Sequence, residues 1–86
     1  MDKEKLIKKA QIYLDKKSVS FDAISMDSVI FEENRKIRGG IIKSIYIISY
    51  ESFLKDSSEG ITNFVVLDAE TEELLFIMTP NGFIEN

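Results

Sequence analysis

The stretch IIKSIYIISY, residues 41–50, is the clearest strand in the chain and decides its class of fold. Seven of its ten residues are isoleucine or tyrosine, which favour the pleated surface of a β-sheet. Apolar residues occupy both its odd and its even positions, which point to opposite faces of a sheet. We therefore predict a central strand that is covered on one face and partly shielded on the other.

The chain after this strand alternates between turn-forming and strand-forming segments. In chain order we predict an exposed loop at 54–60, a strand at 61–67, a tight turn at 68–71, a strand at 73–79 and a turn at 80–82. Phe83 and Ile84 are expected to pack back onto the core. These segments add two strands and a short closing stretch to the sheet.

The chain before the central strand begins with an amphipathic helix. Residues 2–17 carry apolar side chains at spacings of three and four, namely Leu6, Ala10, Tyr13 and Leu14. Asp2 is a suitable N-cap, and lysines at the end suit the helix dipole. A helix of this length needs an apolar partner surface, which the sheet supplies.

Between this helix and the central strand, residues 26–33 are rich in β-formers and predict a strand. A polar connection follows, and Arg38-Gly39-Gly40 is typical of a hairpin turn. Residues 18–25 fit either a short strand or a loop. The predicted fold is α+β, with one N-terminal helix packed on an antiparallel meander of about four strands in a two-layer sandwich.

Composition limits the chemistry that this chain can perform. Its 86 residues suffice for one hydrophobic core, so residues 1–86 are expected to form a single domain. Cysteine and histidine are both absent, which removes thiolate catalysis, the commonest general base and the commonest metal ligands. We predict no catalytic residues, no metal, no cofactor, no signal peptide and no membrane span, and a cytoplasmic location.

Charge is distributed unevenly along the chain. Residues 51–86 contain eight acidic residues and one lysine, whereas residues 2–17 contain six lysines and three acidic residues. An acidic surface attracts basic partners and repels phosphate backbones, so we expect a basic protein partner and no nucleic acid. The candidate partner-binding carboxylates are those of the acidic hairpin and the loop before it, namely Asp68, Glu70, Glu72, Glu73 and Glu59. The alternative interpretation is a solvated hairpin that aids solubility.

Three further patterns in the sequence lack a feature that their chemistry would need. The acids from Asp68 onward resemble a calcium loop, but its sixth position would be Glu73, not glycine, and its twelfth would be Thr79, not an acid. Arg38-Gly39-Gly40 precedes a strand and therefore lacks the helix terminus of a phosphate loop. The serines have no histidine to act as base.

Two tyrosines of the central strand are a second candidate contact surface. Tyr46 and Tyr50 share one face of the strand, and tyrosine is a favoured anchor residue at protein interfaces. A sheet meander also leaves two strand edges available for pairing. The sequence therefore leaves open whether the chain forms a homodimer through a strand edge or through the Tyr46/Tyr50 face.

The carboxy-terminal passage FVVLDAETEELLFIMTPNGFIEN, residues 64–86, resembles the closing hairpin of small cystatin-like and PepSY-like domains. In those domains an Asp-x-x-Thr-Gly-type turn joins the last two strands, and here Glu72 stands in place of the glycine. The passage is also similar to cystatin-like immunity proteins that neutralise bacterial contact-delivered toxins. This resemblance implies a small, acidic, non-catalytic protein that blocks a basic nuclease toxin. The alternative is an accessory module that modulates a protease or another partner.

Overall fold

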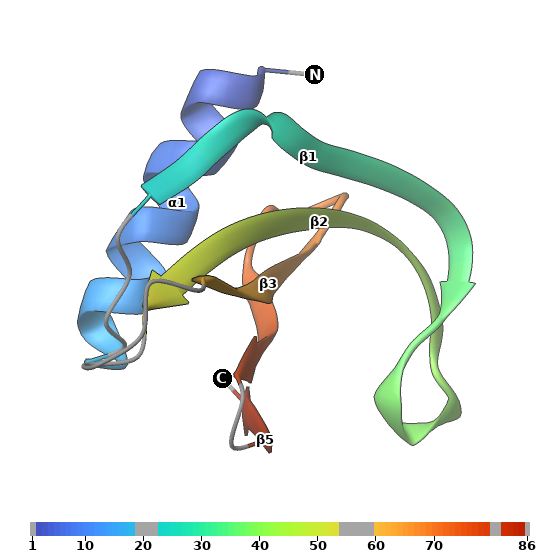
Figure 1. Ribbon diagram of the computed structural model, residues 1–86. Coiled ribbons are helices and arrows are strands. Elements are labelled where there is room, and N and C mark those ends of the chain that lie inside the picture. The colour runs from blue at the N-terminus through green and yellow to red at the C-terminus, as the bar shows by residue number, and fades with distance from the viewer. Residues whose placement is uncertain (1, 19–22, 54–59, 80–81, 86) are drawn as a thin grey trace.

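The computed structural model describes residues 2–18, 23–53, 60–79 and 82–85. One helix, α1 (Lys3–Lys16), lies on one side of a five-stranded antiparallel sheet (Figure 1). The strands are β1 (Ala23–Lys36), β2 (Ile42–Phe53), β3 (Gly60–Asp68), β4 (Leu74–Thr79) and β5 (Gly82–Glu85). They lie side by side in chain order, so each strand pairs with its neighbours in the sequence.

The predicted α+β class and the helix packed on an antiparallel sheet are confirmed, and the sheet has five strands instead of four. The additional strand is β5, which the sequence indicated only as a closing segment. It pairs with β4 in the register Met78 to Phe83 and Ile77 to Ile84. Of the two predicted core residues, Ile84 packs against the core on the helix side, whereas Phe83 remains 48% exposed.

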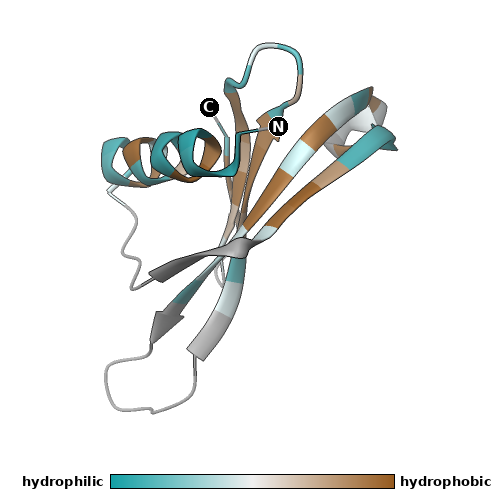
Figure 2. Ribbon diagram, turned by 90° about the horizontal axis from the view of Figure 1, so that it is seen from above, coloured by the Kyte–Doolittle hydropathy of each residue, from teal (hydrophilic) through white to brown (hydrophobic). Residues whose placement is uncertain are grey.

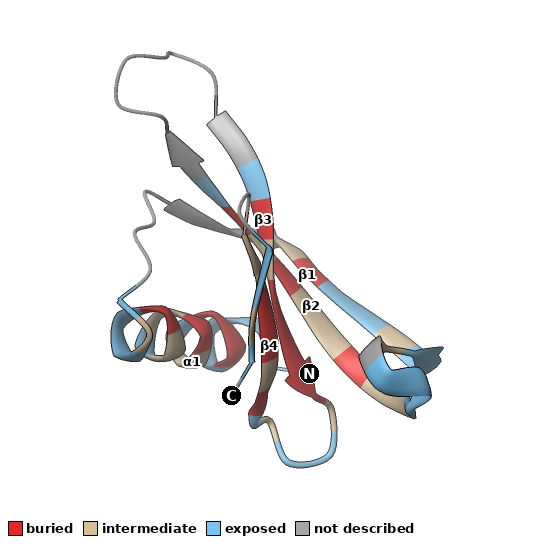
Figure 3. Cartoon of the chain, turned by 90° about the horizontal axis from the view of Figure 1, so that it is seen from below, coloured by how far each residue is buried: buried red, intermediate tan, exposed pale blue. Residues whose placement is uncertain are grey.

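Helix α1 begins as its sequence predicts. The Asp2 carboxylate accepts a hydrogen bond from the backbone N–H of Lys5 at 3.1 Å, which satisfies one of the donors left over in the first turn. The buried side chains of the helix are Leu6, Ile7, Ala10 and Leu14. Figure 2 shows the helix lying against one face of the sheet, and Figure 3 shows its buried residues on the side that meets the strands.

Strand β1 is longer than predicted and bends strongly together with β2. It includes residues 34–36, which were expected to form a connection, and residues 23–25 of the ambiguous segment, whose residues 19–22 lie outside the described part. Its pairing with β2 shifts register between Ile24 and Val29 and again between Glu32 and Arg35. Such bulges bend a strand and increase its twist. The two strands consequently arch over the opposite face of the sheet (Figure 1).

The turn between β1 and β2 confirms the predicted role of its glycines. Arg38–Gly40 form one short 3-10 turn in which Gly39 and Gly40 have φ of 82° and 77°. Only glycine adopts such angles without strain, which explains the Gly-Gly pair at this hairpin. The predicted loop at 54–60 lies outside the described residues except for Gly60, which begins β3.

The sheet has one face covered by the helix and one open face. On the helix side a single core cluster joins α1 to four strands, and Ile48, Val65, Leu67 and Ile77 are fully buried in it. Fully burying a side chain of this size contributes about 1.5–3 kcal/mol. On the open face a smaller cluster buries Ile45, Val66 and Phe76. This arrangement matches the predicted central strand, covered on one face and partly shielded on the other.

Candidate functional site

The turn that joins β3 to β4 carries most of the predicted site residues, and its backbone is held by Asp68. One carboxylate oxygen of Asp68 accepts hydrogen bonds from the backbone N–H groups of Glu70 at 2.8 Å and Thr71 at 3.4 Å. The backbone N–H of Asp68 donates to the Glu73 carbonyl at 2.9 Å. Aspartate favours turns for this reason, because its short side chain bonds to the backbone that follows.

On the open face, the same turn is fixed to strand β2 by an ion pair. The second carboxylate oxygen of Asp68 lies 2.7 Å from the Lys43 ammonium, and Asp68 as a whole is only 7% exposed. The hydrogen bond from Lys43, together with those from the Glu70 and Thr71 backbone, holds the pKa of Asp68 below its ordinary value. The same hydrogen bond raises the pKa of Lys43. Asp68 is therefore charged and internally paired.

On the helix side, Glu72 fixes the turn to α1. Its carboxylate lies 3.0 Å from the Lys9 ammonium and 3.3 Å from that of Lys5. Lys9 and then Lys5 lower the pKa of Glu72 through these contacts. The residue has a φ of 61°, in the left-handed region that glycine adopts more readily than other residues. Two ion pairs thus offset the strain of a non-glycine residue at this position.

The exposed carboxylates of this turn are those of Glu70 and Glu73. Both residues are exposed, in contrast to Asp68 and Glu72, whose charges are neutralised by three lysines. Figure 3 shows the turn as a mostly exposed loop beyond the ends of β3 and β4. The fifth predicted carboxylate, Glu59, lies outside the described residues. The structure therefore divides the acidic hairpin into two residues that hold the turn and two that face solvent.

A polar notch lies beside the exposed Glu70. It has a volume of about 290 Å³ and is lined by Asn34, Ile42, Lys43, Ser44, Asp68 and Glu70. The residues come from β1, from β2 and from the acidic turn, so the notch sits where the turn meets the β1–β2 hairpin. Sequence reasoning missed it because its walls are brought together only by the pairing of β2 with β1 and β3.

The two candidate tyrosines lie on the helix side of the sheet. Tyr50 is only 2% exposed and belongs to the core, so its ring is not presented at the surface. Burial raises the pKa of its hydroxyl, which has no hydrogen-bond partner in the described part of the chain. Tyr46 is half-buried and contacts Phe31, with the two rings tilted by 50° and their centroids 5.5 Å apart. The pair shares one face as predicted, but Tyr50 is core.

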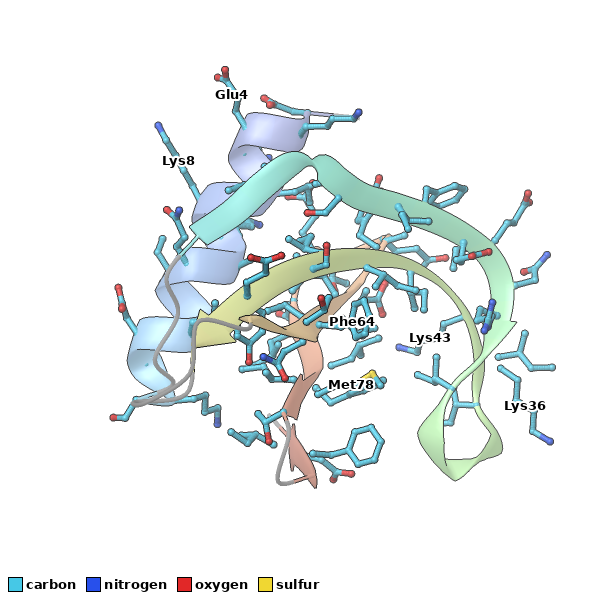
Figure 4. All side chains as sticks on the ribbon, in the orientation of Figure 1. Glu4, Lys8, Lys36, Lys43, Phe64 and Met78 are labelled. Carbon is cyan, nitrogen blue, oxygen red and sulfur yellow. The ribbon has the colours of Figure 1, made fainter. Side chains whose placement is uncertain are left out.

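The open face of the sheet contains an apolar groove that sequence reasoning did not identify. It has a volume of about 360 Å³, and its apolar walls are Ile37, Ile45, Ile47, Phe64, Val66, Phe76, Met78 and Phe83. Arg35 and Lys36 complete it at the β1 end. Figure 4 shows Phe64 and Met78 beneath the arch of β2, whereas Glu4 and Lys8 point away from the sheet on the outer side of α1.

Among the residues that the structure describes, no group of three or more acidic side chains is arranged to hold a metal ion. In the same part of the chain, no helix has the length and apolar composition needed to cross a membrane. Comparison with known proteins found no match to a protein-family model, to a curated protein or to a solved structure. The resemblance to cystatin-like and PepSY-like domains therefore stays a prediction.

Proposed function

We propose that this chain is a non-catalytic protein-binding domain that inhibits a basic protein partner, in the manner of a toxin-immunity protein. The observation that carries this proposal is the acidic turn, which is held from both faces of the sheet while Glu70 and Glu73 point to solvent. A recognition loop that is fixed before binding loses less conformational entropy on association.

The notch beside Glu70 is the place where a basic side chain of the partner would bind. The exposed carboxylate of Glu70 suits the hydrogen-bonding groups of a lysine or arginine side chain, whereas Asp68 in the wall of the notch is already paired with Lys43. The exposed carboxylates of Glu70 and Glu73 steer a cationic partner to the turn and accelerate association. The absence of cysteine and histidine from the sequence also agrees with a binding role.

The proposal is tested by capturing partners from the lysate of the native organism at low and at high salt. We expect a basic protein that is retained at low salt and released by salt. The double variant Glu70→Lys/Glu73→Lys should slow its association at least about tenfold and leave the melting temperature nearly unchanged.

A matched control is Asp15→Lys/Glu51→Lys, which changes the net charge equally at two exposed positions away from the turn and the notch. The control should slow association much less than the variant in the turn. Equal effects of the two variants would show that the partner senses only net charge, and the acidic turn would then not be the site.

A second candidate function is supported by the apolar groove. An accessory module that contacts a protease or another partner through its sheet would use apolar contacts, which depend weakly on salt. A captured partner that is insensitive to both salt and the Glu70/Glu73 variant would favour this function over the first.

A further inference from the structure

Strands β1 and β2 continue past α1 as a paired ribbon (Figure 1). On this ribbon Phe31 faces Tyr46 across the two strands, and their ring centroids are 5.5 Å apart. Two residues earlier on β1, Val29 faces Ile48 in the core beneath the helix. Since alternate residues of a strand share a face, Phe31 and Tyr46 lie on the helix-side face of the sheet. The helix does not cover this part of the face fully, because Phe31 remains 48% exposed.

The same apolar surface reaches the polar notch beside the acidic turn. Tyr46, Ser44 and Ile42 alternate along β2 and therefore share one face. Ile42 is 65% exposed, and both Ile42 and Ser44 line the notch together with Glu70. We refer to Phe31, Ile42 and Tyr46 as the ribbon patch. The ribbon patch and the notch form one continuous surface, because Ile42 belongs to both.

Two charged residues decide what kind of side chain fits each half of this surface. Glu70 is exposed and forms no ion pair within the described residues, whereas the neighbouring Asp68 is paired with Lys43. A basic side chain of the partner therefore finds its counterion at Glu70. Lys36 faces Ile42 across the two strands and is exposed. A second basic side chain over the ribbon patch would meet this like charge, which is unfavourable, so the patch favours an apolar side chain.

The spacing of the two halves matches an extended segment of chain. Ser44 in the notch and Tyr46 in the ribbon patch are two residues apart on β2, which corresponds to about 6.6 Å. In an extended peptide, side chains two residues apart also lie on one face at this distance. A partner segment that runs along β2 can therefore place one side chain in the notch and the next side chain of the same face on the ribbon patch.

We propose that the ribbon patch is the apolar half of the partner-binding surface, with Phe31 as its anchor residue. It takes an apolar side chain that lies two residues from the lysine or arginine bound at Glu70, in an extended segment of the basic partner. This inference rests on the proposed function and specifies a sequence pattern for the partner. Buried aromatic residues carry much of the binding energy of an interface, whereas exposed charges mainly accelerate association.

Phe31 replaces Tyr50 in the predicted aromatic contact surface. Tyr50 is 2% exposed and belongs to the core, so of the predicted pair only Tyr46 reaches this surface. The sequence did not single out Phe31, because its contact with Tyr46 follows from the register of β1 and β2.

The first test uses two peptides with blocked ends that carry the same charge. One contains Arg-Ser-Leu and the other Arg-Ser-Ser, each between two glycines. NMR titration of the full chain, labelled with nitrogen-15, measures both affinities. We expect the Arg-Ser-Leu peptide to bind at least about threefold more tightly, because binding removes part of its leucine side chain from water. Its binding should also shift the amide signals of Phe31 and Ser44.

Two phenylalanine variants then locate the apolar contact. Phe31→Ser should remove the difference between the peptides, and Phe83→Ser should preserve it. Phe83 is a matched control because it has the same exposed fraction, 48%, and lies in the edge strand at the other side of the sheet. Each of the two phenylalanine rings also contacts another aromatic ring. The amide spectrum of each variant shows whether it is folded.

Glu70→Lys tests the charged half of the surface separately. It should weaken the binding of both peptides by the same factor, at least about threefold, and keep the preference for leucine. Glu51→Lys is the control, because it changes the net charge equally at an exposed position away from the notch. It should weaken binding less.

Equal affinities of the two peptides would overturn this inference and leave the proposed function standing, because a basic side chain would still bind. Loss of the leucine preference in Phe83→Ser, but not in Phe31→Ser, would place the contact in the apolar groove and would also overturn it. If neither peptide binds, the inferred segment is wrong, while partner capture from the lysate still tests the proposed function independently.

Discussion

The two faces of the sheet bury apolar residues by different means. The helix-side face is covered by α1, and four of its strand residues have no exposed surface. The open face has no covering element among the described residues, and its cluster is shielded by the curvature of the sheet itself. Each face also supplies one attachment of the acidic turn, through Glu72 on the helix side and Asp68 on the open side.

This difference indicates which face of the sheet stabilises the fold more strongly. A second layer excludes water completely, whereas curvature shields the centre of a face and leaves its rim accessible. We therefore expect the helix side to supply most of the stability of the molecule, while apolar surface stays accessible on the open side.

The two faces should differ most in the loss of unfolding free energy when neighbouring residues of β4, one on each face, are replaced by alanine. Ile77 is fully buried on the helix side and Met78 is half-buried on the open side. Ile77→Ala should lower the free energy of unfolding by about 3 kcal/mol, and Met78→Ala by about 1 kcal/mol, because only the first leaves an enclosed cavity. Urea unfolding at a concentration that keeps the chain monomeric checks this. Equal losses would contradict the contrast between the faces.

The attachment on the open side should be the stronger of the two. Asp68→Ala removes a nearly buried carboxylate and leaves the backbone N–H groups of Glu70 and Thr71 without their acceptor. We expect a loss of about 2 kcal/mol. Glu70→Ala, an exposed residue of the same turn, is the control and should change stability by less than about 0.5 kcal/mol. A similar loss in both variants would show that Asp68 does not hold the turn.

At the attachment on the helix side, Glu72 stabilises the fold through its ion pairs and destabilises it through its strained backbone. Glu72→Ala loses the ion pairs to Lys5 and Lys9 and keeps the strained φ, so it should cost about 1 kcal/mol. Glu72→Gly loses the same pairs but relieves the strain, and should stay within about 0.5 kcal/mol of the unmodified chain. Thermal unfolding of the two variants side by side checks this order. A glycine variant less stable than the alanine variant would refute the strain.

Protonation of Asp68 and Glu72 at low pH should lower the free energy of unfolding less than their substitution does. Asp68 and Glu72 have lowered pKa values in the folded chain. As the pH falls, these carboxylates therefore bind protons in the unfolded chain before they do so in the folded chain. Their contribution is complete above the ordinary carboxyl pKa of about 4 and is lost as the pH falls through the lower folded values. The loss is smaller than in the substitutions because a protonated carboxyl keeps its volume. Urea midpoints between about pH 5 and about pH 2.5 should fall less steeply for Glu72→Gln.

The sequence predicts those parts of the fold that depend on local patterns. The helix and the central strands have regular apolar spacing, and they form where predicted. Strand β5 was missed because four residues give too short a pattern to identify. The extension of β1 through Asn34, Arg35 and Lys36 was missed because polar residues of this kind are uncommon in strands.

The sequence predicted which residues make up the candidate site but not how they are arranged. The acidic residues of the turn are visible in the sequence, but their pairing with Lys43, Lys5 and Lys9 depends on tertiary packing. The left-handed backbone of Glu72 is the one feature with a local signal, since the resemblance places a glycine there. The groove had no such signal, because it results from the bend of β1 and β2.

The strand order has a consequence for how the chain reaches its native state. Because every strand pairs with its neighbour in the sequence, the sheet can grow hairpin by hairpin through contacts of low sequence separation, which favours rapid folding. Helix α1 is different. It is synthesised before every strand of the sheet, whereas β4, which belongs to its core, and the Glu72 attachment are synthesised later. During synthesis the apolar stripe of the helix therefore stays incompletely covered until β4 has emerged, and the final docking of the helix is expected to complete folding.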